Sequence, residues 1–261
     1  MGQNKLEIFK REENLLGQVS AIIATTRKIL EIYDDGNYEE IPVFRANKCR
    51  TANYNNGDAG KNLELIWKFH HLSGVNSSPV VYDNVLYFGS ESRYFFALDF
   101  NSGTEIWKFK TGKEVRSSAA IHKNTIYFGS FDTYFYALHL KTGILKWKFK
   151  TDDWIFSSPV YDEQTVFFGS MDKSLYALNI HDGSLKWKFQ TQGWIISSPA
   201  VYKNFIYFGS RDKHIYCLDK HTGALVWKLK TKAGIHSTPS VYKNNLFHSH
   251  SMVEGGLEVI S

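Results

Sequence analysis

Short runs of alternating apolar and polar residues, separated by turn residues, fill the middle of the chain. Within residues 77–110 the runs cover 77–82, 85–89, 94–99 and 104–109, and the segments between them are rich in Asp, Asn, Ser and Gly. Runs of five or six residues bounded in this way are typical of short β-strands. The pattern therefore predicts four consecutive strands that pair as an antiparallel sheet.

The whole unit returns every 40 residues, and a tryptophan returns with it. The tryptophans are Trp67, Trp107, Trp147, Trp187 and Trp227, and the clear repeats span 77–110, 117–150, 157–190 and 197–230. A fixed period near 40 with four strands per unit is typical of β-propellers. We expect an all-β protein with one domain, residues 1–261, built from four-stranded antiparallel blades.

The two ends of the sequence diverge from the repeat and are expected to close the propeller. A fifth unit lacks a fourth strand after its third strand at 256–260, and residues 5–10 can supply it. The segment ending at Trp67 then forms a divergent first blade, so that 1–69 and 237–261 complete a six-bladed ring without an open edge. Five blades with a separate N-terminal segment, or seven blades, are alternative counts.

Two kinds of turn residue recur with the repeat, and we interpret both as structural. A glycine precedes each outer strand and predicts a backbone with positive φ, which other residues resist. These glycines are Gly103, Gly143, Gly183 and Gly223. An aspartate recurs in the Gly-Ser-x-Asp turns, at Asp132, Asp172 and Asp212, and its regular recurrence favours turn capping over catalysis.

The stretch 97–107, Ala-Leu-Asp-Phe-Asn-Ser-Gly-Thr-Glu-Ile-Trp, resembles the tryptophan-docking motif of pyrroloquinoline-quinone (PQQ) enzymes and their relatives. In that repeat the tryptophan of the outer strand packs against the neighbouring blade. The resemblance implies a PQQ-like β-propeller, here a short cytoplasmic member. The same repeat builds quinoprotein dehydrogenases and the β-propeller lipoprotein of the outer-membrane barrel assembly machinery.

Characteristic features of those relatives are missing from this sequence. Quinoprotein dehydrogenases typically have eight blades and often an adjacent cysteine pair and a calcium site, whereas the two cysteines here are Cys49 and Cys217. The lipoprotein needs a lipidated N-terminal cysteine, which this sequence does not show. We therefore expect no PQQ, no other cofactor and no bound metal.

Composition and charge narrow the class of protein. Of the 261 residues, 43% are hydrophobic and 16% aromatic, which is enough for a well-packed folded body. The first 30 residues contain no uninterrupted apolar run, and two cysteines are too few for a disulfide framework, so we expect a cytoplasmic protein without membrane contact. The net charge of +5 comes partly from lysines flanking the repeated tryptophans. Lysines at these positions favour protection of exposed strand edges over a nucleic-acid surface.

Three adjacent positions before each Ser-Ser-Pro segment, or its equivalent, differ in how much they vary. The middle position is always β-branched (Val75, Val115, Ile155, Ile195 and Ile235), which predicts a core residue. The position before it reads Gly74, Glu114, Trp154, Trp194 and Gly234, and the position after it reads Asn76, Arg116, Phe156, Ile196 and His236. Variation inside an otherwise regular repeat indicates a ligand site, which we expect on the loops around the mouth of the central channel.

The residue types at these variable positions predict their roles. Trp154, Trp194 and Phe156 form an aromatic wall, with Glu114, Arg116 and His236 as polar groups and Asn76 and His250 as further ligand contacts. In an enzyme, His236 or Glu114 moves a proton and Arg116 stabilises developing negative charge. The alternative interpretation is a set of tolerated differences at loop ends.

Histidines concentrate near the C-terminus and beside Trp67. They are His236, His248 and His250, with His70 and His71 on the adjacent blade. A His-x-His pair can bind zinc, but no third ligand is placed, so surface histidines on a polar closing blade are the favoured interpretation.

Three functions follow from these patterns. The first is a binding or scaffold protein that holds a small molecule or a partner's peptide at the channel mouth. The second is an enzyme of a specialised pathway that acts on an apolar or aromatic substrate by acid–base catalysis. The third, nucleic-acid binding through the lysines, predicts a steep loss of affinity with salt.

Overall fold

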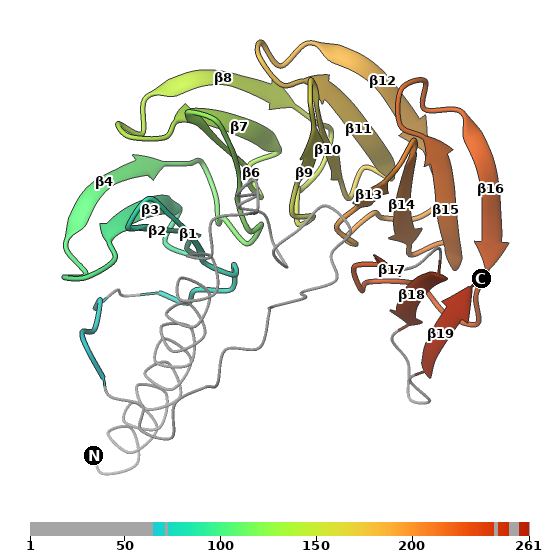
Figure 1. Ribbon diagram of the computed structural model, residues 1–261, viewed down its shortest axis with the longest axis horizontal. Helices are drawn as coiled ribbons and strands as arrows, with labels where there is room; N and C mark the ends of the chain where they lie inside the picture. Colours follow the sequence, from blue (N-terminus) through green and yellow to red (C-terminus); the bar gives the residue numbers. More distant parts are fainter. Residues whose placement is uncertain (1–64, 71–72, 243–244, 251–255, 261) are drawn as a thin grey trace.

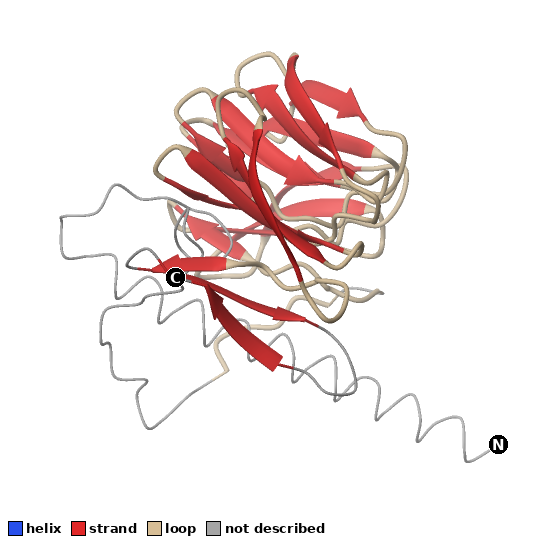
Figure 2. Cartoon of the chain, turned by 90° about the vertical axis from the view of Figure 1, so that its right-hand side faces the viewer, coloured by secondary structure: helices blue, strands red, loops and turns tan. Residues whose placement is uncertain are grey.

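The computed structural model describes residues 65–70, 73–242, 245–250 and 256–260. Within this part of the chain the regular elements are β-strands, and they form five antiparallel sheets set around an arc, with the first strand of each sheet innermost (Figure 1). The strands run between two groups of loops at opposite ends of the sheets (Figure 2). The all-β propeller with four-stranded antiparallel blades is therefore confirmed.

The first four sheets each contain four strands in chain order. The first sheet holds β1 (Val80–Tyr82), β2 (Val85–Gly89), β3 (Tyr94–Asp99) and β4 (Glu105–Lys110), and the second holds β5 (Ala120–His122), β6 (Thr125–Gly129), β7 (Tyr134–His139) and β8 (Leu145–Lys150). The third holds β9 (Val160–Asp162), β10 (Thr165–Gly169), β11 (Ser174–Asn179) and β12 (Leu185–Gln190), and the fourth holds β13 (Ala200–Tyr202), β14 (Phe205–Ser210), β15 (His214–Asp219) and β16 (Leu225–Lys230).

The fifth sheet contains β17 (Ser240–Tyr242), β18 (Asn245–His250) and β19 (Gly256–Ile260). Its third strand has the predicted bounds. The fourth strand that we expected from residues 5–10, and most of the divergent first blade, lie outside the described residues. The six-blade count therefore stays a prediction.

The innermost strands are shorter than predicted, because a serine side chain replaces the first part of the ladder. The first strand was expected from Ser77 but begins at Val80. The Ser77 hydroxyl donates to the Gly89 carbonyl at 2.9 Å and accepts the Gly89 N–H at 2.8 Å. Both backbone groups of Gly89 are satisfied without a paired strand.

A second serine links each sheet to the next near the centre of the arc. The backbone N–H of Ser78 donates to the Ser118 hydroxyl at 2.8 Å, that of Ser118 to Ser158 at 3.0 Å, and that of Ser158 to Ser198 at 2.8 Å. Because the partners are 40 residues apart, each bond joins equivalent points of neighbouring sheets.

The hydrophobic core lies between the faces of successive sheets. Phe95 of the first sheet stacks on Phe128 of the second with ring centroids 4.1 Å apart, and Phe135 stacks on Phe168 of the third at 4.0 Å. All four rings are buried. Each sheet is therefore stabilised mainly by its neighbours, as repeat architectures require.

The repeated tryptophans pack against the glycines of the next sheet. The Trp107 indole N–H donates to the Leu140 carbonyl at 3.0 Å, and a Cβ on Gly143 would lie 2.6 Å from Cε3 of Trp107. The φ angle of Gly143 is +67°, as predicted. The same contact joins Trp67 to Gly103, Trp147 to Gly183, and Trp187 to Gly223. Trp67 thus lies against the first sheet in the same way as the tryptophan of each outer strand lies against the following sheet.

The recurring aspartates stabilise turns and connect sheets. Asp172 accepts a backbone N–H two residues later at 3.0 Å, the Tyr176 hydroxyl at 2.6 Å and the Asp152 N–H at 3.2 Å. Asp132 and Asp212 do the same with Tyr136 and Tyr216. In the first sheet both members of the Asp–Tyr pair are different: Ser92 stands in place of the aspartate and Phe96 in place of the tyrosine. These bonds agree with the capping interpretation.

Candidate functional site

The variable positions meet on one end of the sheets. The residue after the serine in each β2–β3-type loop donates its N–H to the carbonyl of the residue before the β-branched position. The bonds run from Glu91 to Gly74, Phe131 to Glu114, Met171 to Trp154 and Arg211 to Trp194, at 2.9–3.0 Å. We call this surface the loop rim: residues 74–76, 91, 114–116, 131, 154–156, 171, 194–196, 211 and 234–236.

Four of the five β-branched positions of the loop rim are core residues, as predicted, and the fifth, Val75, is half-buried against the core. Val115, Ile155, Ile195 and Ile235 are fully buried. Each packs against the glycine that ends the second strand of the preceding sheet; a Cβ on Gly129 would lie 2.7 Å from Cβ of Ile155. The β-branched residue therefore fixes the position of each loop, while the residues directly before and after it can vary.

The predicted aromatic wall is divided into two groups. Trp154 stacks on Phe131 with centroids 4.7 Å apart and planes 14° apart, and Phe156 lies 5.9 Å from the same ring. Trp194 instead lies beside Arg211, whose guanidinium carbon is 5.8 Å from the indole centroid. Trp154, Phe156 and Trp194 are 39%, 37% and 42% exposed.

Arg116 is already paired and does not point to an open charge site. Its guanidinium forms a 2.8 Å ion pair with Glu91 and lies 5.1 Å from the Phe131 ring centroid. The same Glu91 carboxylate accepts a 2.5 Å hydrogen bond from Asn76. Glu91 and Phe131 were missed in the sequence, although both occupy the variable position of the Gly-Ser-x turn.

His236 is held by Arg211, another residue that sequence reasoning missed. The guanidinium donates to Nε2 of His236, so this nitrogen is the unprotonated one. Burial and the positive charge of Arg211 lower the pKa of His236 below its ordinary value. Glu114 lies in the loop between β4 and β5 and His236 in the loop between β16 and β17. The contacts of the described residues join His236 to Arg211 and not to Glu114.

Acidification is expected to weaken the contact between His236 and Arg211. Because folding lowers the pKa of His236, the unfolded chain binds more protons below the ordinary histidine pKa of about 6.5. The contribution of this contact to the free energy of unfolding is present at neutral pH. It is lost as the pH falls from neutral toward the pKa that His236 has in the folded protein. NMR titration of the imidazole should give a higher pKa in Arg211→Gln than in the unmodified protein. An unchanged pKa would mean that Arg211 does not lower it.

The remaining histidines do not form a visible ligand set. His248 is 1% exposed and takes the place that Phe88, Phe128, Phe168 and Phe208 have in the other sheets, so the surface interpretation is wrong for this residue. His70 is exposed, and the side chains of His71 and His250 lie outside the described residues. In the described part of the chain, no three His, Cys, Asp or Glu side chains could hold a metal ion.

Comparison with known proteins agrees with this geometry. Residues 60–261 match the family described as beta-alanine-activating enzyme, beta-propeller. The chain belongs to this beta-propeller family. No curated protein matches the chain. Among the described residues of this family member, no helix is long and apolar enough to cross a membrane.

Solved structures show the same fold at low sequence identity. BamB from Moraxella catarrhalis is 18% identical with a TM-score of 0.65, covering 74% of this chain and 60% of BamB. The computationally designed Ika8 protein is 18% identical with a TM-score of 0.62, covering 69% of this chain and 56% of Ika8. Quinohemoprotein alcohol dehydrogenase ADHIIG from Pseudomonas putida HK5 is 19% identical with a TM-score of 0.57, covering 74% of this chain and 39% of the enzyme. These neighbours support a PQQ-like propeller for this family member, which spans less than two thirds of each.

Proposed function

We propose that the protein is a binding or scaffold propeller that holds a small molecule or a partner's peptide on the loop rim. The observation that carries the proposal is the exposure of Trp154, Phe156 and Trp194, each more than a third accessible on the same end of the sheets. Exposed aromatic residues gathered on one surface are typical of binding sites.

The charges beside these rings suggest the character of the ligand. The Lys113 ammonium lies 5.6 Å from the Trp154 ring centroid, and Arg211 lies beside Trp194. Within the described residues neither cation has an ion-pair partner among the acidic side chains. A ligand with apolar groups and a negative charge matches this combination.

Binding is favoured over catalysis because two of the predicted catalytic groups on the loop rim, Arg116 and His236, are engaged by other side chains. Arg116 is neutralised by Glu91, and Nε2 of His236 accepts from Arg211. The enzyme alternative rests on the lowered pKa of His236, which keeps the imidazole unprotonated, as a general base requires. The name of the family pairs an activating enzyme with a propeller, and we infer a binding role for the propeller part.

The outer strands support edge protection and not a nucleic-acid site. The ammonium group of Lys148 lies 4.2 Å from the Tyr134 ring centroid, and that of Lys188 lies 5.0 Å from the ring of Tyr176. Lysines held over rings of their own sheet are less available to phosphates. We also infer that the Trp–Gly contacts serve the docking role that the resemblance implies, and that the protein acts in the cytoplasm.

Replacing Trp154 and Trp194 together by alanine is expected to abolish ligand retention. Native mass spectrometry of the protein isolated gently from its own cells measures the retained mass. Loss of two aromatic contacts should weaken binding by about 100-fold or more, because interface aromatic residues often contribute 2 kcal/mol or more each. Leu145→Ala with Leu185→Ala, at exposed positions on the outer strands β8 and β12, is the matched control and should retain the ligand.

The outcomes separate the two functions. A retained small molecule that the double tryptophan variant loses supports the binding site and leads to tests of turnover. Turnover that His236→Ala abolishes, with the fold and the affinity intact, would establish the enzyme instead. A ligand retained equally by all variants would contradict a site on the loop rim.

A further inference from the structure

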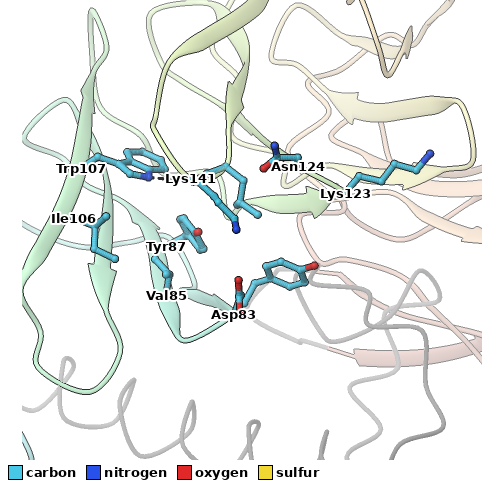
Figure 3. A pocket seen from close by; sticks show the side chains of 10 residues that line it. Asp83, Val85, Tyr87, Ile106, Trp107, Lys123, Asn124 and Lys141 are labelled. Atoms are coloured by element: carbon cyan, nitrogen blue, oxygen red, sulfur yellow. Dashed lines mark hydrogen bonds between the residues drawn. The ribbon is translucent and has the colours of Figure 1, made fainter.

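A cavity of about 650 Å³ lies between the first and second sheets (Figure 3). The turns that line it are at the end of the strands opposite to the loop rim. It is lined by the β1–β2 turn and β4 of the first sheet and by the β5–β6 and β7–β8 turns of the second. Its volume lies in the range of small-molecule sites. None of the residues singled out from the sequence as ligand contacts lines it.

The inner wall of the cavity is aromatic and apolar. Tyr87 and Trp107 contribute rings with centroids 5.9 Å apart and planes at 47°. Both residues are buried, and Val85, Ile106 and Leu140 continue the apolar surface. A flat apolar group fits against such a wall.

The outer edge of the cavity is polar and carries more positive than negative charge. Lys123, Lys141 and Asn124 lie on one side and Asp83 on the other. Figure 3 shows the Lys141 side chain pointing into the space beside Tyr87 and Asp83. Neither lysine has an ion-pair partner among the described residues. The amide of Asn124 is held by a 2.9 Å hydrogen bond to His139, so this polar group is fixed in advance.

The next two equivalent grooves are bridged. Between the second and third sheets, the Tyr127 hydroxyl donates to the Ile180 carbonyl at 3.0 Å. Between the third and fourth sheets, Lys220 forms an ion pair with Asp162. In the first groove Tyr87 takes the place of Tyr127 but makes no such bond within the described residues.

The side chains along the wall of the first groove also differ from those in the next two sheets. Lys146 donates to the Thr125 hydroxyl at 2.7 Å in the second sheet, and Lys186 donates to Thr165 at 2.8 Å in the third. The first sheet has Ile106 and Val85 at these two positions. The fourth sheet is also apolar at these positions, with Phe205 and Val226, so the lysine–threonine bond is absent from the first and fourth sheets and the small apolar pair of the first sheet does not follow from the propeller geometry alone.

We propose that this cavity binds a small aromatic carboxylate, with its ring against Tyr87 and Trp107 and its carboxylate accepting from Lys141. The Asn124 amide lies at the same edge and can donate to the second carboxylate oxygen. Burial and the neighbouring Asp83 raise the pKa of Tyr87, so its phenol stays neutral and does not repel the anion. The site is separate from the loop rim and does not depend on the function proposed for it.

The test uses 2-naphthoate as the probe and isothermal titration calorimetry as the measurement. The unmodified protein should bind 2-naphthoate and should not bind 2-naphthylmethylammonium, which has the same ring and the opposite charge. Lys141→Ala should weaken binding by about tenfold or more, because it removes a charge-assisted hydrogen bond. Lys203→Ala, in the β13–β14 turn of the fourth sheet and outside the cavity lining, is the lysine control and should change nothing.

A second variant tests the cavity itself. Val85→Phe introduces the residue that the fourth sheet has at this position, Phe205, so the backbone is known to accept it. The added ring should fill the space and abolish binding while the thermal unfolding temperature stays close to that of the unmodified protein. Absence of binding, equal binding of the ammonium probe, or binding that persists in both Lys141→Ala and Val85→Phe would each overturn the proposal. Loss of 2-naphthoate binding in Trp154→Ala would also overturn it by placing the probe on the loop rim.

Discussion

Replacing Trp107 by alanine is expected to lower the free energy of unfolding by about 3–5 kcal/mol, as is typical for truncation of a buried tryptophan. The side chain is 9% exposed and packs with Phe95 in the core between the first and second sheets. It also donates to the Leu140 carbonyl and covers Gly143. The variant therefore loses apolar burial, a hydrogen bond and the contact that joins two sheets at their outer edges.

Chemical denaturation followed by circular dichroism measures this loss, and Trp154→Ala is its matched control. The control makes the same chemical change at a residue that is 39% exposed and stacks on one ring. Its cost should be about 1 kcal/mol, the typical contribution of an aromatic pair. Equal losses in the two variants would show that burial between the sheets does not determine the role of Trp107.

The architecture was predictable because every structural demand repeats with the blade. The strands at 85–89 and 94–99 have the predicted bounds, and the outer strand is displaced by one residue, since β4 covers Glu105–Lys110. The error at Ser77 has a physical cause. A hydroxyl that imitates a ladder bond leaves the alternation of the sequence unchanged, so the pattern cannot show where pairing stops.

The candidate site was predictable only in part. Variation inside a regular repeat found Trp154 and Phe156, but the same criterion also marks the x position of the Gly-Ser-x turns, which reads Glu91, Phe131, Met171 and Arg211. Applied there, it would have found the partners of Arg116 and His236. The pairing itself depends on how two loops approach each other across sheets, which no local pattern encodes.

The cavity between the first and second sheets could not be predicted from the sequence, for a different reason. It depends on apolar residues at Val85 and Ile106 and on the missing hydroxyl bond of Tyr87. Each difference looks neutral in an aligned repeat. Only the packing of the two sheets shows that together they leave space.

Replacing Gly129 by alanine is expected to destabilise the protein by about 3 kcal/mol, at the upper end of the cost of overpacking. The φ angle of Gly129 is not positive, so the cost is steric and not conformational. A methyl group there would lie 2.7 Å from Cβ of Ile155 and closer still to its Cγ2. Ile155 is fully buried and cannot move away without shifting the third sheet.

The steric origin of this cost is tested by a double-mutant cycle with Ile155→Ala. The single change at Ile155 should cost about 2–5 kcal/mol as a cavity. Because each change relieves the other, the double variant should be more stable than the sum of the two losses by about 1–3 kcal/mol. Gly112→Ala is the control. A Cβ on Gly112 would lie 3.0 Å from Cβ of Asp132, and the later repeats have Asp152 and Gln192 in place of Gly112. Strict additivity in the cycle would mean that the β-branched residues do not require glycine on the preceding sheet, and that the loops of the rim are fixed by other contacts.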